Sequence, residues 1–328
     1  MATERDASSS SSSLRFVALG DWGGNEARAN LPHPFTSVAQ RATAKALAKH
    51  VGKTQPQFLL SLGDNFYQSG VQSVDDPRFN ATFESVYGDA ALAALPWYLV
   101  AGNHDHLGSI AAQLAYSQRS PRWHFPSEFY VERFAFGRSS LAVIFLDGTL
   151  FQAQWMRRPF AFVNQKYGDM LRSFEQFHWL NRTLAATRDA DWLIVVCHMP
   201  IMSVAEYAGN PMMIAHLMPL LELHNVAVYL SGHTHTLQHL RHNRVNYVVS
   251  GCGAAANINR WNWFNVPAGS LRFCYPRVRE QQQADFTRQT DGGFASFTLH
   301  NATTASLRFI DSASSTLYAA TIANPRRR

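Results

Sequence analysis

The chain has 328 residues, of which 46% are hydrophobic, 12% aromatic and 16% charged. This composition excludes a fibrous or disordered protein, and no apolar stretch reaches the roughly 18 residues that a membrane-spanning helix needs. The net charge of +6 is spread along the chain, which favours anionic ligands but argues against nucleic-acid binding.

Apolar runs typical of strands alternate with helical patterns, which predicts a layered α/β fold. Residues 1–13, which end in six serines, are expected to form a disordered tail, residues 14–322 the folded domain, and residues 323–328 a basic tail. In chain order the predicted elements of the α/β part are strand Leu14–Leu19, helix Thr36–Val51, strand Phe58–Leu62, helix Phe79–Tyr87, strands Trp97–Ala101 and Leu141–Leu146, helix Met170–Ala186, strand Trp192–Cys197, helix Met213–His224, and strands Val226–Ser231 and Tyr247–Ser250. The last part of the chain is predicted to be mainly β, with strands Leu271–Tyr275, Gly293–His300, Ser306–Ile310 and Leu317–Ile322. Two loops are predicted there, at 260–270 and 277–291.

Five of these strands run directly into a residue type that binds metal ions. The residues are Asp21, Asp64, Asn103, His198 and His233, and four of them follow a glycine. A glycine lets the backbone turn sharply and lets an ion approach closely. Because the carboxyl ends of strands in an α/β sheet meet at one edge, we expect these side chains to converge there.

Two kinds of donor are present. Asp21, Asp64 and Tyr67 offer hard oxygen atoms. A phenol with a pKa of about 10 is a poor ligand unless a strongly charged ion holds it as the phenolate, and iron(III) is the natural candidate.

Asn103, His198 and His233 suit a divalent ion such as zinc, iron(II) or manganese. His233 and His235 stand two residues apart across a turn, so they can reach two adjacent ions. The donors therefore predict two metal ions of different charge.

Five blocks in this order resemble the purple acid phosphatases, in particular their small tartrate-resistant type, within the metallophosphoesterases. The blocks are Gly20–Gly24, Gly63–Tyr67, Gly102–Asp105, Val195–His198 and Gly232–His235, and the resemblance extends from Arg15 to about Ala320. Each block alone is a weak signal, but all five in order are specific. The resemblance implies a single-domain α/β fold of two packed mixed β-sheets flanked by helices.

The resemblance also implies roles for individual residues. Asn103 and His104 are the substrate contacts that it implies. Beside the motifs, His106 is expected either to border the substrate pocket or to support His104, and Tyr207 can hydrogen-bond a phosphate, so both are further predicted substrate contacts. His104 would orient the phosphate and protonate the leaving alkoxide. The predicted ligands are Asp21, Tyr67 and His235 for iron(III), Asn103, His198 and His233 for the divalent ion (iron(II), zinc or manganese), and Asp64 for both.

The implied reaction is hydrolysis of phosphate monoesters by a metal-activated hydroxide, which two adjacent ions keep available in acid. Small esters are the expected substrates, with phosphoproteins and nucleotides as larger candidates, and a monomer is expected. Relatives of this type are secreted or lysosomal, whereas the N-terminus shows no apolar core of a secretory signal, so the compartment stays open.

Several positions depart from the tartrate-resistant type or lie beside its motifs. Tyr207 stands where that type has a second active-site histidine, so cationic proton donation from that side is lost. The loop Phe151–Asp169, with Arg157 and Arg158, is expected to act as a flap that favours acidic or large substrates. Asp105 is interpreted as a supporting residue rather than a ligand.

The three cysteines are odd in number, so at least one thiol is free. Cys197, which precedes a predicted ligand, is expected to serve core packing rather than catalysis.

Two other functions stay open on the residues alone. One is a redox-active or iron-carrying protein on the same di-iron site, against which His104 argues, since a carrier needs no proton donor. The other is a phosphoprotein phosphatase or phosphodiesterase on the same fold, against which Tyr67 argues, since sites with only divalent ions have no use for it.

Overall fold

The computed structural model describes residues 4–5, 11–24, 35–153, 167–207, 209–276, 287–288 and 291–327. One sheet is built from β1 (Glu4–Arg5), β6 (Tyr130–Phe136), β7 (Ser139–Leu146), β8 (Trp192–Cys197), β9 (Val228–Ser231), β10 (Leu237–His242), β11 (Val245–Ser250) and β13 (Leu271–Tyr275). The other contains β2 (Leu14–Leu19), β3 (Phe58–Ser61), β4 (Trp97–Leu99), β5 (Trp123–His124), β15 (Gly293–Leu299), β16 (Thr304–Asp311) and β17 (Thr316–Ala323), and a small ribbon pairs β12 (Ala256–Asn257) with β14 (Thr287–Arg288).

The helices lie between and around these strands. They are α1 (Val38–Thr54), the π-helix η1 (Phe79–Glu84), α2 (Ala90–Ala93), the 3₁₀ turn η2 (Asp105–Leu107), α3 (Ile110–Tyr116), α4 (Gly148–Ala153), α5 (Tyr167–Ala186), the π-helix η3 (Met213–Leu217), α6 (Met218–Leu223) and the 3₁₀ turn η4 (Trp263–Asn265).

The strand orders are β1-β6-β7-β8-β9-β11-β10-β13 in the eight-stranded sheet and β17-β16-β15-β2-β3-β4-β5 in the seven-stranded sheet. Both sheets contain a run of parallel strands: β7, β8, β9 and β11 inside the first, and β2, β3, β4 and β5, which reaches the edge, in the second. The mixed sheets confirm the predicted fold class.

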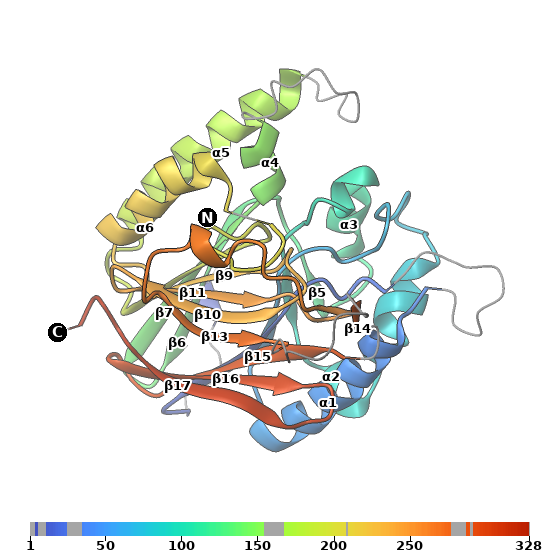
Figure 1. Cartoon of the computed structure of the whole chain (residues 1–328). Coiled ribbons are helices and arrows are strands. Elements are labelled where there is room, and N and C mark those ends of the chain that lie inside the picture. Colours follow the sequence, from blue (N-terminus) through green and yellow to red (C-terminus); the bar gives the residue numbers. More distant parts are fainter. Residues whose placement is uncertain are drawn as a thin grey trace.

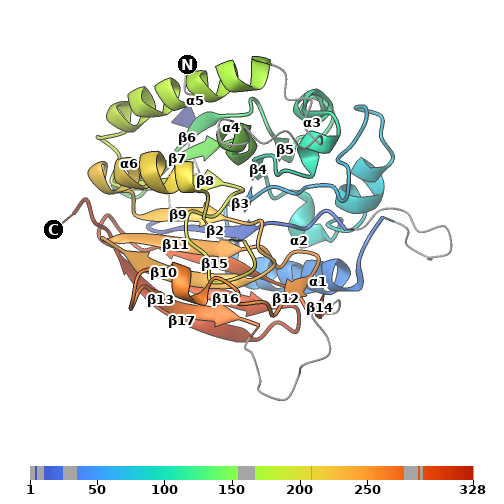
Figure 2. The same cartoon turned by 45° about the horizontal axis from the view of Figure 1, so that its top comes forward.

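The two sheets pack face to face with helices on their outer sides, as Figures 1 and 2 show. Phe58 of β3 stacks on Phe134 of β6 at a ring-centroid distance of 4.2 Å, which joins the sheets through their shared core. Leu180 of α5 and Leu221 of α6 pack into a second core on the outer face of the eight-stranded sheet. Helix α1 covers the other sheet, where His50 bonds to Ser296 of β15.

Buried strands supply side chains to both cores by alternation. In β7, Leu141, Val143 and Phe145 face the core between the sheets, whereas Ala142 and Ile144 face the helices. A strand that is covered on both faces has a continuous run of apolar residues, and this run is the feature that predicted β7 from the sequence.

The predicted strands at Leu14–Leu19, Trp192–Cys197 and Leu271–Tyr275 are observed with the same bounds, and the other predicted strands differ at their ends. The predicted helix Met213–His224 is observed as the π-helix η3 followed directly by α6, and Pro219, which has no backbone N–H, lies at the start of α6. The predicted loop at 277–291 contains β14, and the one at 260–270 contains η4.

The sequence pattern did not reveal β10, whose central residues include Gln238 and His239. Both side chains are buried, and Gln238 donates to Ser203 and Thr236. This strand accommodates buried polar residues because other side chains form hydrogen bonds to them. The hydrophobic periodicity of the sequence does not reveal such partners.

The predicted tails include ordered contacts. Strand β1, within the predicted tail 1–13, pairs in parallel with β6 at a sheet edge that offers free backbone groups. At the other terminus, Arg326 donates to the carbonyls of Thr187, Ala190 and His224. No helix among the described residues is long and apolar enough to cross a membrane.

Candidate metal centre

The predicted ligands follow strands of both sheets. Asp21, Asp64 and Asn103 stand just beyond β2, β3 and β4 of the seven-stranded sheet, and His198 and His233 just beyond β8 and β9 of the eight-stranded sheet. Because each group of strands is parallel, its carboxyl ends point to the same edge. The site therefore forms where two such edges meet.

Three of the predicted ligands have a left-handed backbone. The φ angles are 56° at Asp21, 51° at Asp64 and 67° at His233, in a region that residues other than glycine seldom occupy. Next to them, a Cβ on Gly102 would overlap the backbone and side chain of Asp64. Such strain collects at functional sites, where the surrounding structure holds side chains in required positions.

One group of donor atoms comes from Asp21, Tyr67 and His235. The Tyr67 hydroxyl lies 3.0 Å from Asp21 Oδ1 and 3.0 Å from His235 Nε2, and His235 Nε2 lies 3.5 Å from Asp21 Oδ1. Ligand bonds of about 2.1 Å at right angles place neighbouring donor atoms about 3 Å apart. These three residues therefore have the spacing of ligands around one ion.

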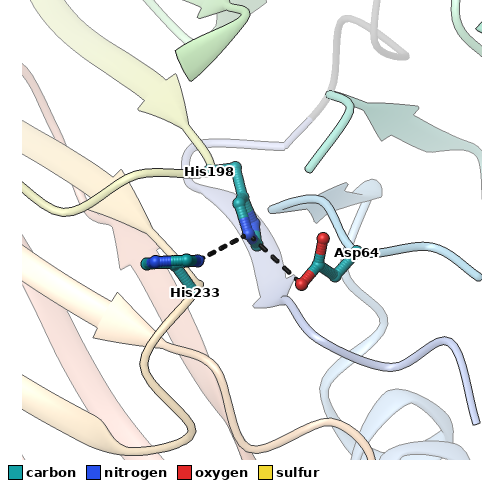
Figure 3. Close-up of side chains that lie close together, drawn as sticks. All are labelled: Asp64, His198 and His233. Atoms are coloured by element: carbon teal, nitrogen blue, oxygen red, sulfur yellow. Dashed lines mark hydrogen bonds and ion pairs between the residues drawn. The ribbon is translucent and has the colours of Figure 1, made fainter. Parts of the chain in front are cut away.

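A second group surrounds His198. Its Nε2 lies 3.2 Å from Asn103 Oδ1, 3.3 Å from His233 Nδ1 and 3.4 Å from Asp64 Oδ2. Figure 3 shows the imidazole of His198 between His233 and Asp64, with a dashed line to each. Donor atoms of Asp64, His198 and His233 lie within 4.8 Å of one another, a spacing that can hold a metal ion.

The bonding of His198 shows that this second group fits a cation. Its Nδ1 lies 2.8 Å from the carbonyl oxygen of Leu62, which can only accept, so Nδ1 carries a proton. In a neutral ring, Nε2 then presents a lone pair to Asn103 and Asp64, which also offer lone pairs. Such an arrangement is repulsive unless a positive charge lies among the donor atoms.

The ionisation of the site also calls for positive charge. Burial alone would lower the pKa of His198, but the Asp64 carboxylate raises it to about 10, so that a second proton supplies the charge when no metal does. Burial and the charge of His198 lower the pKa of His233 to about 3, which leaves His233 neutral and able to bind a metal.

Tyr67 needs a strong cation to ionise. Burial, and then the carboxylates of Asp21 and Asp64, raise the pKa of the Tyr67 phenol well above its ordinary value. In their presence the phenol stays protonated and donates to Asp21. A phenolate at this position is compatible only with an ion that outweighs both carboxylates.

His104 lies beside both groups of donors. Its backbone N–H donates to Asp64 Oδ1 at 3.0 Å, and its ring lies edge-on to Tyr67 with centroids 4.7 Å apart. Nδ1 lies 2.6 Å from the carbonyl oxygen of Gln68, so this nitrogen carries a proton. No hydrogen bond from the described part of the chain engages its other ring nitrogen, Nε2.

Comparison with known proteins agrees with this geometry. The calcineurin-like phosphoesterase family model matches residues 14–237. Human tartrate-resistant acid phosphatase type 5 is 41% identical over 293 residues, covering 86% of this chain and 82% of the human protein. Purple acid phosphatase 4 of Arabidopsis thaliana is 30% identical over 273 residues, covering 80% of this chain and 75% of the plant protein. The chain belongs to the purple acid phosphatase family.

Solved structures agree with the fold. GAP50, the anchor in the inner membrane complex of Plasmodium, aligns with a TM-score of 0.75 at 22% identity, over 95% of this chain and 89% of its own. The purple acid phosphatase PPD1 from yellow lupin aligns with a TM-score of 0.60 at 17% identity, over 95% of this chain and 54% of its own.

Tyr207 borders the metal centre of this purple acid phosphatase. Its ring lies against His233, with centroids 4.4 Å apart at 33°, and 47% of the residue is exposed. Burial and the neighbouring Glu206 raise the pKa of its phenol, so Tyr207 stays neutral. It offers a hydroxyl and an aromatic face but no cation.

Asp105 holds the ligand loops, as its interpretation as a supporting residue predicts. Its carboxylate accepts from the backbone N–H groups of Asn65, Phe66 and Gly102 and from the side chain of Gln113. Burial, together with the Asp64 charge, raises the pKa of Asp105 to about 6 despite these donors. Asp105 thus ties the loop after β3 to the loop after β4.

The structure pairs His106 with a residue that sequence reasoning missed. His106 Nε2 lies 2.6 Å from Oδ2 of Asp147, which is buried and follows β7 directly. The sequence did contain a signal for Asp147, because this carboxylate stands at the end of a predicted strand and has a glycine beside it, as the predicted ligands Asp21 and Asp64 do. A substrate contact for His106 stays a prediction.

All three cysteines are free. Cys197 is fully buried, and burial raises the pKa of its thiol to about 12, which agrees with a packing role. The predicted flap Phe151–Asp169, with Arg157 and Arg158, lies outside the described residues except at its ends.

Proposed function

We propose that this chain is an acid phosphatase that hydrolyses phosphate monoesters at a binuclear iron(III)–divalent metal site. The observation that supports this most is the division of the donor atoms into two groups that share one carboxylate. Asp64 is close enough to Tyr67 of the first group for its charge to raise the pKa of that phenol, and its Oδ2 lies 3.4 Å from His198 Nε2 of the second. Asp21, Tyr67 and His235 would hold iron(III), and Asn103, His198 and His233 would hold iron(II), zinc or manganese.

Bound ions would supply Lewis acidity to the phosphate and lower the pKa of water. The chain itself supplies the proton for the leaving group. The Gln68 carbonyl engages Nδ1 of His104, which leaves Nε2 as the ring nitrogen that passes a proton to the departing oxygen. The His104 backbone bond to Asp64 keeps the ring beside the donors.

The substitution His104→Ala tests this assignment. We expect turnover of a chromogenic phosphate ester to fall by roughly 10²–10⁴-fold while the metal content is unchanged. His300, which is exposed and bonded to Ser306, gives the matched control His300→Ala, which should retain wild-type turnover. Full activity in His104→Ala would contradict the role of His104, and a wild-type protein that binds iron but hydrolyses no ester would favour the iron-carrying alternative.

The iron(III) assignment has its own test, the visible absorption of the air-oxidised protein with metal analysis. A phenolate bound to iron(III) absorbs visible light, so we expect a broad band and about one iron(III) per chain, with the band lost in Tyr67→Phe. Tyr318→Phe, which changes a phenol bonded to His239, is the control that should keep the band. A colourless wild-type protein with only divalent metal would replace this proposal with a general two-metal phosphoesterase.

We also propose that small esters are substrates, that phosphoproteins and nucleotides are larger candidates, and that the protein is a monomer. Native mass measurement tests the oligomeric state directly.

A further inference from the structure

Four aromatic side chains near the metal centre face solvent. The exposed fractions are 47% for Tyr207, 76% for Trp261, 50% for Trp263 and 92% for Phe264, and we call these residues the aromatic strip. Elsewhere in the described chain Trp22, Trp97, Trp123 and Trp192 are fully buried, whereas Phe174 of α5 is 50% exposed. Exposed apolar groups gathered in one place are typical of an interaction site.

Hydrogen bonds hold the loop of the aromatic strip in place. Asn262 donates from its backbone to the carbonyl of Val204 at 3.3 Å and from its side chain to the carbonyl of Ala205 at 2.6 Å. The backbone N–H of Trp261 donates to the Asn259 side chain at 2.9 Å. The rings are therefore presented by an ordered backbone, which reduces the entropy lost when a ligand binds.

The same network connects the aromatic strip to the predicted ligands. Asn257 donates from its backbone to the carbonyl of His235 at 2.7 Å and from its side chain to Glu206 at 2.6 Å, beside Tyr207. Trp261 follows Asn257 by four residues, so their Cα atoms lie within about 14 Å of each other. The strip thus begins at Tyr207, which packs against His233, and its other three residues follow Asn257, which bonds the His235 backbone.

The charge around the aromatic strip indicates what it binds. Residues 256–270, all of which the structure describes, contain a single charged residue, Arg260. Its guanidinium donates to the carbonyls of Asn257, Asn259 and Pro276, so this cation is already engaged. The loop therefore offers apolar surface rather than the free lysines and arginines that bind anionic membranes.

We propose that the aromatic strip binds apolar side chains next to the phosphorylated residue of a polypeptide substrate. This inference rests on the phosphatase function proposed above. Each aromatic ring presents on the order of 150–250 Å² of surface, so a single small leaving group covers only part of four rings, whereas a peptide chain covers several. Tyr207 lies nearest the phosphate site, and Trp261, Trp263 and Phe264 contact residues farther along the peptide.

The test compares two phosphoserine peptides of equal length and charge on the metal-loaded, full-length enzyme. One has leucine and phenylalanine around the phosphoserine, and the other has glycine and threonine. We expect kcat/KM to favour the apolar peptide by about tenfold, through KM, in keeping with aromatic contacts at interfaces. In the double variant W261S/F264S the preference should fall to about twofold or less. The rate on a chromogenic ester corrects each protein for its fraction of active enzyme.

The matched control is Leu223→Ser, which changes a residue that is 72% exposed at the end of α6, before β9 and so at the opposite edge of the sheet. It should keep the tenfold preference. An equal preference in wild type and W261S/F264S overturns the inference and leaves the phosphatase proposal standing. Failure of the wild type on every substrate overturns both. Loss of co-sedimentation with phosphatidylcholine vesicles in the variant, with its peptide preference intact, would assign the strip to a lipid surface instead.

Discussion

His106 Nε2 and Asp147 Oδ2 lie 2.6 Å apart and join the loop after β4 to the end of β7 in the other sheet. The second oxygen of Asp147 accepts from the backbone N–H groups of Thr149 and Leu150 at the start of α4. Gln176 of α5 bonds both the N–H and the carbonyl of Asp147. Asp147 therefore connects the turn beside His104 to α4 through its carboxylate and to α5 through its backbone.

Replacing Asp147 should disturb that turn according to how much bonding is lost. Asp147→Ala removes the partner of His106 and the cap of α4, so we expect unfolding free energy to fall by about 2–3 kcal/mol and kcat by about tenfold. Asp147→Asn keeps an oxygen for Thr149 and an N–H for a neutral His106, so both effects should be smaller. Urea unfolding and steady-state kinetics at equal metal content measure them, and equal kcat in all three proteins would show that the pair does not position His104.

Replacing Asp105 should loosen metal binding without removing a ligand. The two carboxylate oxygens of Asp105 accept N–H bonds from Asn65, Phe66, Gly102 and Gln113. In Asp105→Asn, an NH₂ group replaces one of these oxygens, so the N–H groups that pointed at it lose their acceptor and meet another hydrogen-bond donor. We expect resistance to a chelator to fall by about 10–100-fold. Asp75→Asn, at a side chain that is 72% exposed, is the control and should match wild type. Unchanged chelator resistance in Asp105→Asn would exclude this supporting role.

His50 should reduce the stability of the protein in acid. Burial, then the charges of Arg308 and Lys53, lower the pKa of His50 to about 4 in the folded protein. Between pH 6.5 and 4 the unfolded chain binds the proton more readily, so the stabilisation present above pH 6.5 is lost as the pH falls. The loss should be about 1 kcal/mol at pH 4.5, allowing for solvent screening of this partly exposed side chain.

The variant His50→Gln isolates this contribution, because glutamine does not titrate and can still bond Ser296. Urea unfolding at pH 7 and pH 4.5 should show a smaller acid-induced loss in the variant than in wild type. An equal loss in the two proteins would mean that His50 is not the responsible group.

Arg326 should stabilise the fold without affecting the reaction. Its guanidinium binds carbonyls that follow α5 and α6, at the edge of the sheet where β8 and β9 begin, away from the metal centre. We expect Arg326→Ala to lower the free energy of unfolding by about 2 kcal/mol and Arg326→Lys by about half as much, since lysine lacks the planar fork. Arg188→Ala, at an exposed arginine nearby, should change neither stability nor kcat. A reduced kcat in folded Arg326→Ala would contradict the separation of this contact from the site.

The sequence alone was sufficient to select the candidate ligands. Asp21, Asp64, Asn103, His198 and His233 each end a strand, and both the apolar run and the glycine that mark such an end are local features. Parallel strands then bring these residues to one edge by geometry that every α/β sheet shares. The family resemblance divided them into two metal groups, and the observed donor distances agree with that division.

The tertiary structure decided which distant groups meet. Asp147 finds His106 across 41 residues, Asn257 reaches Glu206 across 51, and β10 buries Gln238 because Ser203 accepts from it. The solvent exposure of Trp261 and Phe264 could likewise not be predicted from the sequence, because an aromatic residue in a loop has the same local sequence pattern whether its side chain is packed or faces solvent. Such contacts depend on the order of strands and the paths of loops, and those follow from the packing of the whole chain.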